Sequence, residues 1–280
     1  MTRRLRIGIS TCPNDTFAFH ALLEGRVRPR GLELEFLLAD IEELNRRMLA
    51  GELDLAKTSY HAMLVLGKRV CVLPCGSALG FGVGPLLLAA PRRAAALPLP
   101  AGALVLAPGT WTTASLLFRL LHPEPVSLEQ TVFSDILPRL SAGKADYGVC
   151  IHEARFTWRE HGLGLVADLG TLWEERAGTA LPLGGLCADR GLGAPTIAEL
   201  VRAVRASLEW GLAHREACLA TMRRHAQEQS DAVLWSHVDL YVNEWTLDLG
   251  EVGRNALRAL SRLARERGLV GAESPDLEVA

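Results

Sequence analysis

The chain has 280 residues, of which 49% are hydrophobic and 22% charged, a composition ordinary for a globular protein with one large or two modest cores. Its 30 basic and 32 acidic residues give a net charge of −2 and form no basic patch, which argues against a nucleic-acid binder. Apolar runs fall short of the roughly 18 residues that a membrane-spanning helix needs, and the N-terminal MTRRLRIGIS lacks the apolar region of a secretory signal. We therefore expect a cytoplasmic protein that binds neither nucleic acid nor membrane.

Strand-like and helix-like segments alternate from the N-terminus in a β-α-β-α-β order. The first strand leads into a helix that Asn14, Asp15 or Thr16 can cap and that Gly25 ends. The second helix is amphipathic and ends at Gly51, directly before a short strand. The expected elements are a strand at 5–10, a helix within 11–25, a strand at 32–40, a helix at 41–51 and a strand at 53–59.

The same order recurs further along the chain. Residues 50–54 read AGELD and residues 142–146 read AGKAD, and both lie where a helix turns into a strand. This match at the same point of two similar units indicates an internal repeat. In the second unit we expect a strand at 103–110, a helix at 111–121 that Pro123 stops, a strand at 129–134, a helix at 135–143 and a strand at 146–152.

Two extended segments that contain glycine, 76–91 and 181–190, connect the units to the rest of the chain, and residues 195–270 have helical patterning. Two such connections are what a chain needs to leave one lobe, build another and return. The sequence therefore predicts a two-lobed α/β fold with a central interlobe cleft. Its first lobe is discontinuous, 1–92 and 182–280, and the inserted second lobe is 93–181.

Motifs for nucleotides and metals do not occur. The run Gly80-x-Gly82-x-Gly84 lacks the spacing of a nucleotide-binding loop, so we expect a hinge or a tight backbone crossing there. No cysteine pair and histidine pair complete the spacing of a zinc site, so we expect reduced, buried thiols and no metal. The six cysteines are Cys12, Cys71, Cys75, Cys150, Cys187 and Cys218.

Polar residues gather at four predicted strand ends, 10–16, 57–60, 109–113 and 152–153. Ligands of open α/β sheets bind beyond the carboxyl ends of strands, where the N-termini of helices also point and attract anions. Capping explains any one of these Ser and Thr residues, but their concentration at four ends favours a polar ligand in the cleft. The residues are Ser10, Asn14, Thr16, Lys57, Thr58, Ser59, Thr110, Thr112 and Thr113.

His152 follows the apolar run DYGVCI, which ends the second unit. Position alone favours a structural histidine, yet a side chain at this strand end can enter the cleft. An imidazole is well suited to general-base catalysis near neutral pH. Glu153 could orient His152 or stabilise the start of the next helix. His61 lies close to another strand end and is the second candidate.

Five separated stretches, CPNDTFAFHAL, LAKTSYHA, SALGFGVGPLL, GVCIHEARFTW and HAQEQSDAVLWSHVDLYVNEW, resemble the 1,4-dihydroxy-6-naphthoate synthase family. The resemblance extends from about residue 5 to residue 270. It implies the two-lobed fold of type II periplasmic binding proteins. It also implies a lyase of the futalosine route to menaquinone, which converts cyclic dehypoxanthinyl futalosine to 1,4-dihydroxy-6-naphthoate and releases dihydroxyacetone. No cofactor or metal is implied.

The resemblance also implies the site residues. The family's catalytic base is the histidine of its I-H-E stretch, here His152. Its substrate-binding segments fall on Lys57, Thr58 and Ser59 and on the pair Thr112 and Thr113, and we add Ser10 and Asn14 from the first strand end. Thr11 replaces a proline that is common in the family, a departure that should not affect the chemistry. Lys57 has two interpretations, a source of positive charge or an ordinary solvated residue.

Three alternatives stay open from the residues. The first is a binding protein of the same fold that holds a small anion without chemistry. The second is a related enzyme of the same pathway that dehydrates chorismate, although the CIHEARFTW stretch is not expected in it. The third, a sensor of amino acids or sulfonates, has support only from fold analogy. A small carboxylated molecule is the expected partner, and both a monomer and a homodimer are compatible with the sequence.

Overall fold

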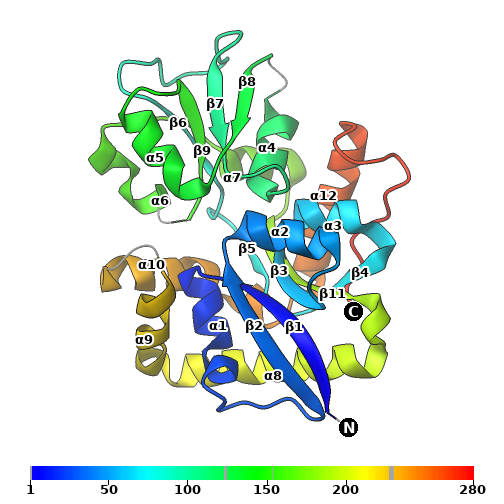
Figure 1. Cartoon of the computed structure of the whole chain (residues 1–280). Helices are drawn as coiled ribbons and strands as arrows, with labels where there is room; N and C mark the ends of the chain where they lie inside the picture. Colours follow the sequence, from blue (N-terminus) through cyan, green and yellow to red (C-terminus); the bar gives the residue numbers. More distant parts are fainter. Residues whose placement is uncertain (1, 123–124, 153, 227–229) are drawn as a thin grey trace.

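Two sheets organise the molecule, one in each half (Figure 1). The computed structural model describes residues 2–122, 125–152, 154–226 and 230–280. The strands alternate with helices in each half, as the periodicity predicted, and the α/β fold class is confirmed. Among the described residues, no helix combines the length and the apolar character that crossing a membrane requires.

The first sheet has the order β2-β1-β3-β11-β4, and β5 also pairs with β11. β1 is parallel to β2 and β3, whereas β11 is antiparallel to its neighbours. The parallel strands bring the carboxyl ends of β1 and β3 to the same edge of the sheet. The strands are β1 (Arg3–Ser10), β2 (Leu32–Ala39), β3 (Leu55–Ser59), β4 (Val70–Val72), β5 (Ala78–Gly80) and β11 (Leu181–Asp189).

The second sheet has the order β10-β6-β9-β7-β8. β7 is parallel to β8 and β9, and β6 runs antiparallel to β9 and β10. β7 and β9 therefore also end at one edge of their sheet, as β1 and β3 do in the first half. The strands are β6 (Leu86–Ala89), β7 (Leu104–Ala107), β8 (Ser127–Gln130), β9 (Tyr147–Cys150) and β10 (Gly164–Asp168).

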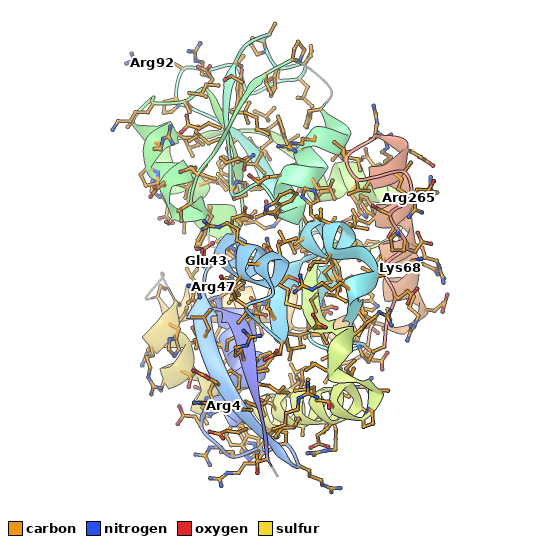
Figure 2. All side chains as sticks on the ribbon, turned by 45° about the vertical axis from the view of Figure 1, so that its right-hand side comes forward. Arg4, Glu43, Arg47, Lys68, Arg92 and Arg265 are labelled. Atoms are coloured by element: carbon orange, nitrogen blue, oxygen red, sulfur yellow. The ribbon has the colours of Figure 1, made fainter. Side chains whose placement is uncertain are left out.

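Helices cover both sheets and lie between them (Figure 1). In the first half α8, α9 and α10 pack against α1, and in the second half α5 packs on β9. Charged side chains such as Arg4, Lys68 and Arg92 point outward from the surface (Figure 2). The helices are α1 (Pro13–Leu23), α2 (Ile41–Ala50), α3 (Tyr60–Leu66), α4 (Thr113–Leu121), α5 (Phe133–Ser141), α6 (Ala154–Thr157), α7 (Leu169–Ala177), α8 (Ala194–Ala213), α9 (Arg215–His225), α10 (Asp231–Tyr241), α11 (Glu244–Leu247) and α12 (Gly250–Glu266).

The start of α1 differs from the prediction. Cys12 is the N-cap residue, and the predicted caps Asn14, Asp15 and Thr16 lie inside the first turn. The reason is Pro13, whose fixed φ and missing N–H suit the first helical position. Asn14 and Asp15 are thereby released from capping and line a pocket.

Boundaries in the second unit also shift. The predicted strand 129–134 is wrong beyond Gln130, because β8 ends there and α5 begins at Phe133. The strands predicted at 103–110 and 146–152 are shorter, ending at Ala107 and Cys150. Apolar residues that follow β8 and β9, such as Val132 and Ile151, extended two of these predictions, since hydrophobicity alone does not distinguish a strand end from a buried loop. β7 ends before Pro108 and Gly109, two residues that are typical of loops. Pro123, predicted to stop α4, lies outside the described residues.

The lobe boundaries at 92/93 and 181/182 stay a proposal. β6, at residues 86–89, pairs within the second sheet, although those boundaries place it in the first lobe. The halves share one apolar core, which joins Ala56 and Leu79 of the first sheet to Leu87 and Val105 of the second. At this junction Gly84 lies against the backbone of Gly170, where an added Cβ would come within 2.2 Å of the Gly170 nitrogen. The predicted tight backbone crossing at the glycine run is therefore confirmed.

Candidate active site

A pocket lies between the two halves of the molecule, and all four predicted strand ends contribute to it. β1 and β3 of the first sheet and β7 and β9 of the second lead into segments that line its wall. The α10 helix, distant in sequence, closes another side. The polar lining residues are Ser10, Asn14, Asp15, Lys57, Ser59, Thr112, Thr113, His152, His237 and Tyr241.

Lys57 lies in the middle of β3 and is only 4% exposed, so the interpretation of a solvated lysine is wrong. Its Nζ is 2.6 Å from Asp15 Oδ1 and donates to the carbonyl oxygen of Gly76 at 2.9 Å. A buried ammonium requires such a partner, since transfer from water without one is very costly. Asp15 therefore neutralises the charge of Lys57 within the pocket wall.

Asn14 connects this ion pair to α10. Its Nδ2 donates to Asp15 Oδ1 at 3.1 Å, and its Oδ1 lies 3.1 Å from His237 Nε2. Burial is the main cause of the lowered pKa of His237, and the nearby His152 and Lys57 lower it further. His237 is consequently a neutral imidazole within the wall of the pocket.

His152 follows β9 and has a φ of +56°, in the left-handed region. This conformation costs a residue with a Cβ about 1–2 kcal/mol, and such outliers cluster at active sites. Cys12 Sγ lies 3.3 Å from His152 Nδ1, and the Phe133 ring contacts the imidazole edge-on at a centroid distance of 4.7 Å. The His152 and His237 rings stack at 6.0 Å. Glu153, predicted to orient His152 or cap a helix, lies outside the described residues.

Ser59, the N-cap of α3, is held by Asn45 of α2. The Asn45 Oδ1 accepts from Ser59 N at 2.8 Å, which fixes the amide so that Nδ2 donates to Ser59 Oγ at 3.1 Å. The hydroxyl of Ser59 therefore accepts from the protein and keeps its own hydrogen for donation. A ligand oxygen in the pocket can receive it.

Thr112 and Thr113 lie at the start of α4, and their hydroxyls form hydrogen bonds with other protein groups. Thr112 Oγ1 caps the helix by accepting from Ser115 N, and Thr113 Oγ1 donates to Leu183 O at 2.5 Å. The first N–H groups of a helix, here of Thr113 and Ala114, have no acceptor within the helix, and the helix dipole favours an anion beside them. These two residues contribute an anion-attracting helix end to the pocket.

The other predicted residues divide into two groups. Ser10 lines the pocket, and its Oγ accepts from Cys12 N at 3.0 Å, which shapes the turn into α1. Thr58 does not line the pocket, because alternate side chains of a strand point to opposite faces and Lys57 and Ser59 occupy the pocket face. Thr16 likewise lies outside the lining and donates to the carbonyl of Cys12.

Glu42 joins the two halves beside the pocket. Its carboxylate accepts from the backbone N–H of Trp111 at 3.0 Å and fills the space next to Gly109, where a Cβ would lie within 2.6 Å of the side chain. Burial raises the pKa of Glu42, and the hydrogen bond from Trp111 partly opposes this. His61, the second candidate base, donates from Nδ1 to Thr112 O and stacks obliquely on Trp111. Burial lowers the pKa of His61 to about 4.

Sequence reasoning missed Asp15, Cys12, His237 and Tyr241 as members of this site. Asp15 lies just after the first strand end, a position that indicates a site residue, but it was interpreted as a helix cap. Nothing local pointed to His237, which comes from the helical C-terminal region and meets Asn14 across 223 positions of chain. Within the described ranges, no group of three or more His, Cys, Asp or Glu side chains could hold a metal ion.

Comparison with known proteins gives a consistent result. Residues 5–266 match the model of a protein family described as menaquinone biosynthesis. The chain is 47% identical over 273 residues to a 1,4-dihydroxy-6-naphthoate synthase of Thermus thermophilus, with 97% of each chain covered. It is 44% identical over 277 residues to the enzyme of that name from Streptomyces coelicolor, covering 97% of this chain and 96% of the other.

Solved structures agree on the fold. A protein of Archaeoglobus fulgidus superposes with a TM-score of 0.89 at 28% identity, over 95% of this chain and 98% of the other. The periplasmic aliphatic sulphonate binding protein of Escherichia coli superposes with a TM-score of 0.65 at 15% identity, over 99% and 91% of the chains. At that identity the likeness concerns the fold alone, and the predicted two-lobed fold of periplasmic binding proteins is confirmed.

Proposed function

The chain belongs to the 1,4-dihydroxy-6-naphthoate synthase family of menaquinone biosynthesis, a family of lyases, and from this premise we propose its substrate, products and catalytic base. The substrate is cyclic dehypoxanthinyl futalosine. The products are 1,4-dihydroxy-6-naphthoate and dihydroxyacetone, formed by cleavage of a carbon–carbon bond. The pocket between the two halves is where we place this reaction.

His152 is the proposed general base. Ring opening of the retro-aldol or eliminative type begins with removal of one proton from a hydroxyl or carbon, and the naphthoate product gains aromaticity. The single observation that carries this assignment is the left-handed backbone at His152, which brings an imidazole into the pocket at the cost of local strain. Cys12 and Phe133 contact the ring and hold its orientation.

We place the substrate carboxylate against the part of the pocket wall that offers hydrogen-bond donors. Ser59 keeps a hydroxyl hydrogen to donate, and the first turn of α4 offers the N–H groups of Thr113 and Ala114. Thr112 supports this turn as its cap, and Ser10 shapes the neighbouring turn. Preorganised donors of this kind also stabilise an oxyanion that develops during ring opening.

Lys57 and Asn14 have supporting roles in this proposal. Because Asp15 neutralises Lys57, the pair contributes no net charge, and the attraction for a carboxylate comes from helix ends. Asn14 links the pair to His237 and fixes the wall that faces the substrate hydroxyls.

Incubation of the purified protein with cyclic dehypoxanthinyl futalosine tests the proposal. We expect dihydroxynaphthoate and dihydroxyacetone to appear in equal amounts, without added cofactor. Chorismate serves as the control substrate, since a dehydratase of the same fold would remove water from it. Binding without product, or water loss from chorismate, contradicts the proposed activity.

A further inference from the structure

We propose that His237 is a second substrate-contacting residue, whose Nδ1 accepts a hydrogen bond from a hydroxyl group of the substrate. The inference rests on the proposed function, because it concerns a substrate with several hydroxyls. It goes beyond that function in assigning the acceptor to α10, a helix that the predicted strand ends did not include.

The tautomer of His237 follows from its neighbours. Asp15 is held beside the Lys57 ammonium, so its carboxylate can only accept, and the Asn14 amide must turn Nδ2 toward it. The Asn14 oxygen then faces His237 Nε2 at 3.1 Å and requires a hydrogen on that nitrogen. A neutral imidazole carries one N–H, so Nδ1 presents a bare lone pair.

That lone pair has no partner within the protein. Among the residues that the structure describes and that line the pocket, only His237 has a buried side-chain nitrogen or oxygen atom, Nδ1, without a hydrogen-bond partner. Leaving a buried acceptor unpaired costs about 1–3 kcal/mol, and each such group in a native structure calls for an explanation. A hydroxyl of the bound substrate removes this cost.

His237 is also held rigidly and kept neutral. It is 1% exposed and packs against Tyr241 one turn further along α10, whose hydroxyl donates to the carbonyl of Val83. In Figure 1 α10 lies beside α1, which carries Asn14. Burial, with the proximity of His152 and Lys57, lowers the pKa of His237, so protonation does not compete with hydrogen bonding near neutral pH. A rigid, neutral acceptor suits recognition of a hydroxyl.

Two amide substitutions separate the two ring nitrogens. Glutamine places its amide nitrogen near the position of Nε2, so His237→Gln keeps the bond to Asn14 and removes the acceptor. Asparagine places its amide oxygen near the position of Nδ1, so His237→Asn keeps an acceptor and loses the bond to Asn14. We expect about a 100-fold loss of kcat/KM in His237→Gln, as for removal of an interaction of about 2.7 kcal/mol, and a loss of less than about 10-fold in His237→Asn.

His20→Gln is the matched control, because His20 is also buried with an unpaired Nε2 but does not line the pocket. Its kcat/KM should equal that of the unaltered protein, and thermal unfolding should show that all three variants fold. Equal losses in the Gln and Asn variants of His237 would indicate a structural role and overturn the proposal, as would normal activity of His237→Gln.

A binding measurement separates this proposal from the proposed function. In ¹⁵N-histidine-labelled His152→Asn protein, addition of cyclic dehypoxanthinyl futalosine should move the Nδ1 resonance of His237 upfield while Nε2 stays in place. An unmoved Nδ1 resonance at saturation overturns the role of His237, even if the unaltered enzyme is active. An inactive enzyme whose Nδ1 resonance moves would instead remove the proposed reaction and keep the contact.

Discussion

Lys57 and Asp15 form an ion pair of 2.6 Å in the wall of the pocket, with side chains that are 5% and 6% exposed. The chain has three lysines, and of these Lys57 is buried whereas Lys68 and Lys144 are exposed. Because Asp15 neutralises Lys57, the positive potential in the pocket comes from the N-termini of helices. The same carboxylate orients Asn14, and Asn14 orients His237. The buried ion pair thus determines which atoms of Asn14 and His237 donate and which accept hydrogen bonds in this wall of the pocket.

Breaking this pair should destabilise the fold strongly. Lys57→Met leaves the Asp15 carboxylate buried and uncompensated, and we expect a loss of about 3–5 kcal/mol in the free energy of unfolding. Adding Asp15→Asn to this variant should recover part of the loss. Urea denaturation measures both, with Arg262→Ala as a control, since its exposed pair with Glu266 should cost less than about 1 kcal/mol. A loss below about 1 kcal/mol in Lys57→Met would contradict this account.

Replacing His152 should slow turnover strongly and leave the fold intact. His152→Asn keeps a side chain that tolerates the left-handed backbone, and His152→Gly removes the strain altogether. We expect kcat to fall by about 10²–10⁴-fold in both, as for loss of a general base, with unfolding free energies within about 1 kcal/mol of the unaltered protein. Steady-state kinetics and denaturation check this, and turnover within tenfold of normal would exclude His152 as the base.

Removal of the Ser59 hydroxyl should weaken substrate binding, whereas removal of the Thr112 hydroxyl should lower the stability of the fold. Ser59→Ala removes a donor to the substrate, so we expect a rise in KM of about tenfold, the equivalent of one hydrogen bond of about 1.4 kcal/mol. Thr112→Ala removes the cap of α4 and should lower the free energy of unfolding by about 1 kcal/mol, whereas Thr112→Ser should restore it. The assignment fails if Ser59→Ala leaves KM unchanged or if Thr112→Ala unfolds like the unaltered protein.

Gly84 should resist substitution because its Cα faces a backbone. In Gly84→Ala the new Cβ would lie 2.2 Å from Gly170 N, and a backbone cannot move aside as a flexible side chain can. We expect a loss of about 1–3 kcal/mol in thermal or urea unfolding, the usual cost of overpacking. Gly271→Ala is the control, since its nearest contact is 3.5 Å, and the two variants should not be equally stable.

Acid should destabilise the protein partly through His61. Its pKa of about 4 in the folded state lies below the value of about 6.5 for an unfolded histidine, so between these pH values the unfolded chain binds a proton that the folded protein does not. The free energy of unfolding should fall as the pH decreases through this window, by up to about 1.4 kcal/mol per pH unit from this residue. His61→Asn keeps a donor to Thr112 O, and its unfolding free energy should depend less steeply on pH. Equal slopes in urea titrations from pH 7 to pH 4 would contradict the prediction.

The sequence by itself was sufficient for the order of the elements and for the edge at which the site lies. Apolar periodicity and terminal glycines such as Gly51 are local signals, because the residues that decide helix or strand lie within one or two turns of each other. Parallel strands then bring their carboxyl ends together, so Ser10, Ser59, Thr113 and His152 could be expected around one pocket without knowledge of any contact.

Only the tertiary structure decided which side chains pair within that pocket. Cys12 meets His152 across 140 positions of chain and His237 meets Asn14 across 223, distances over which local patterning carries no information. The same holds for Lys57, whose charge is neutralised by a residue that local reasoning assigned to a helix cap. Side-chain pairing depends on how the α1, α10 and β3 elements dock together, and docking is set by the burial of apolar surface over the whole core, not by the polar residues that it brings into contact.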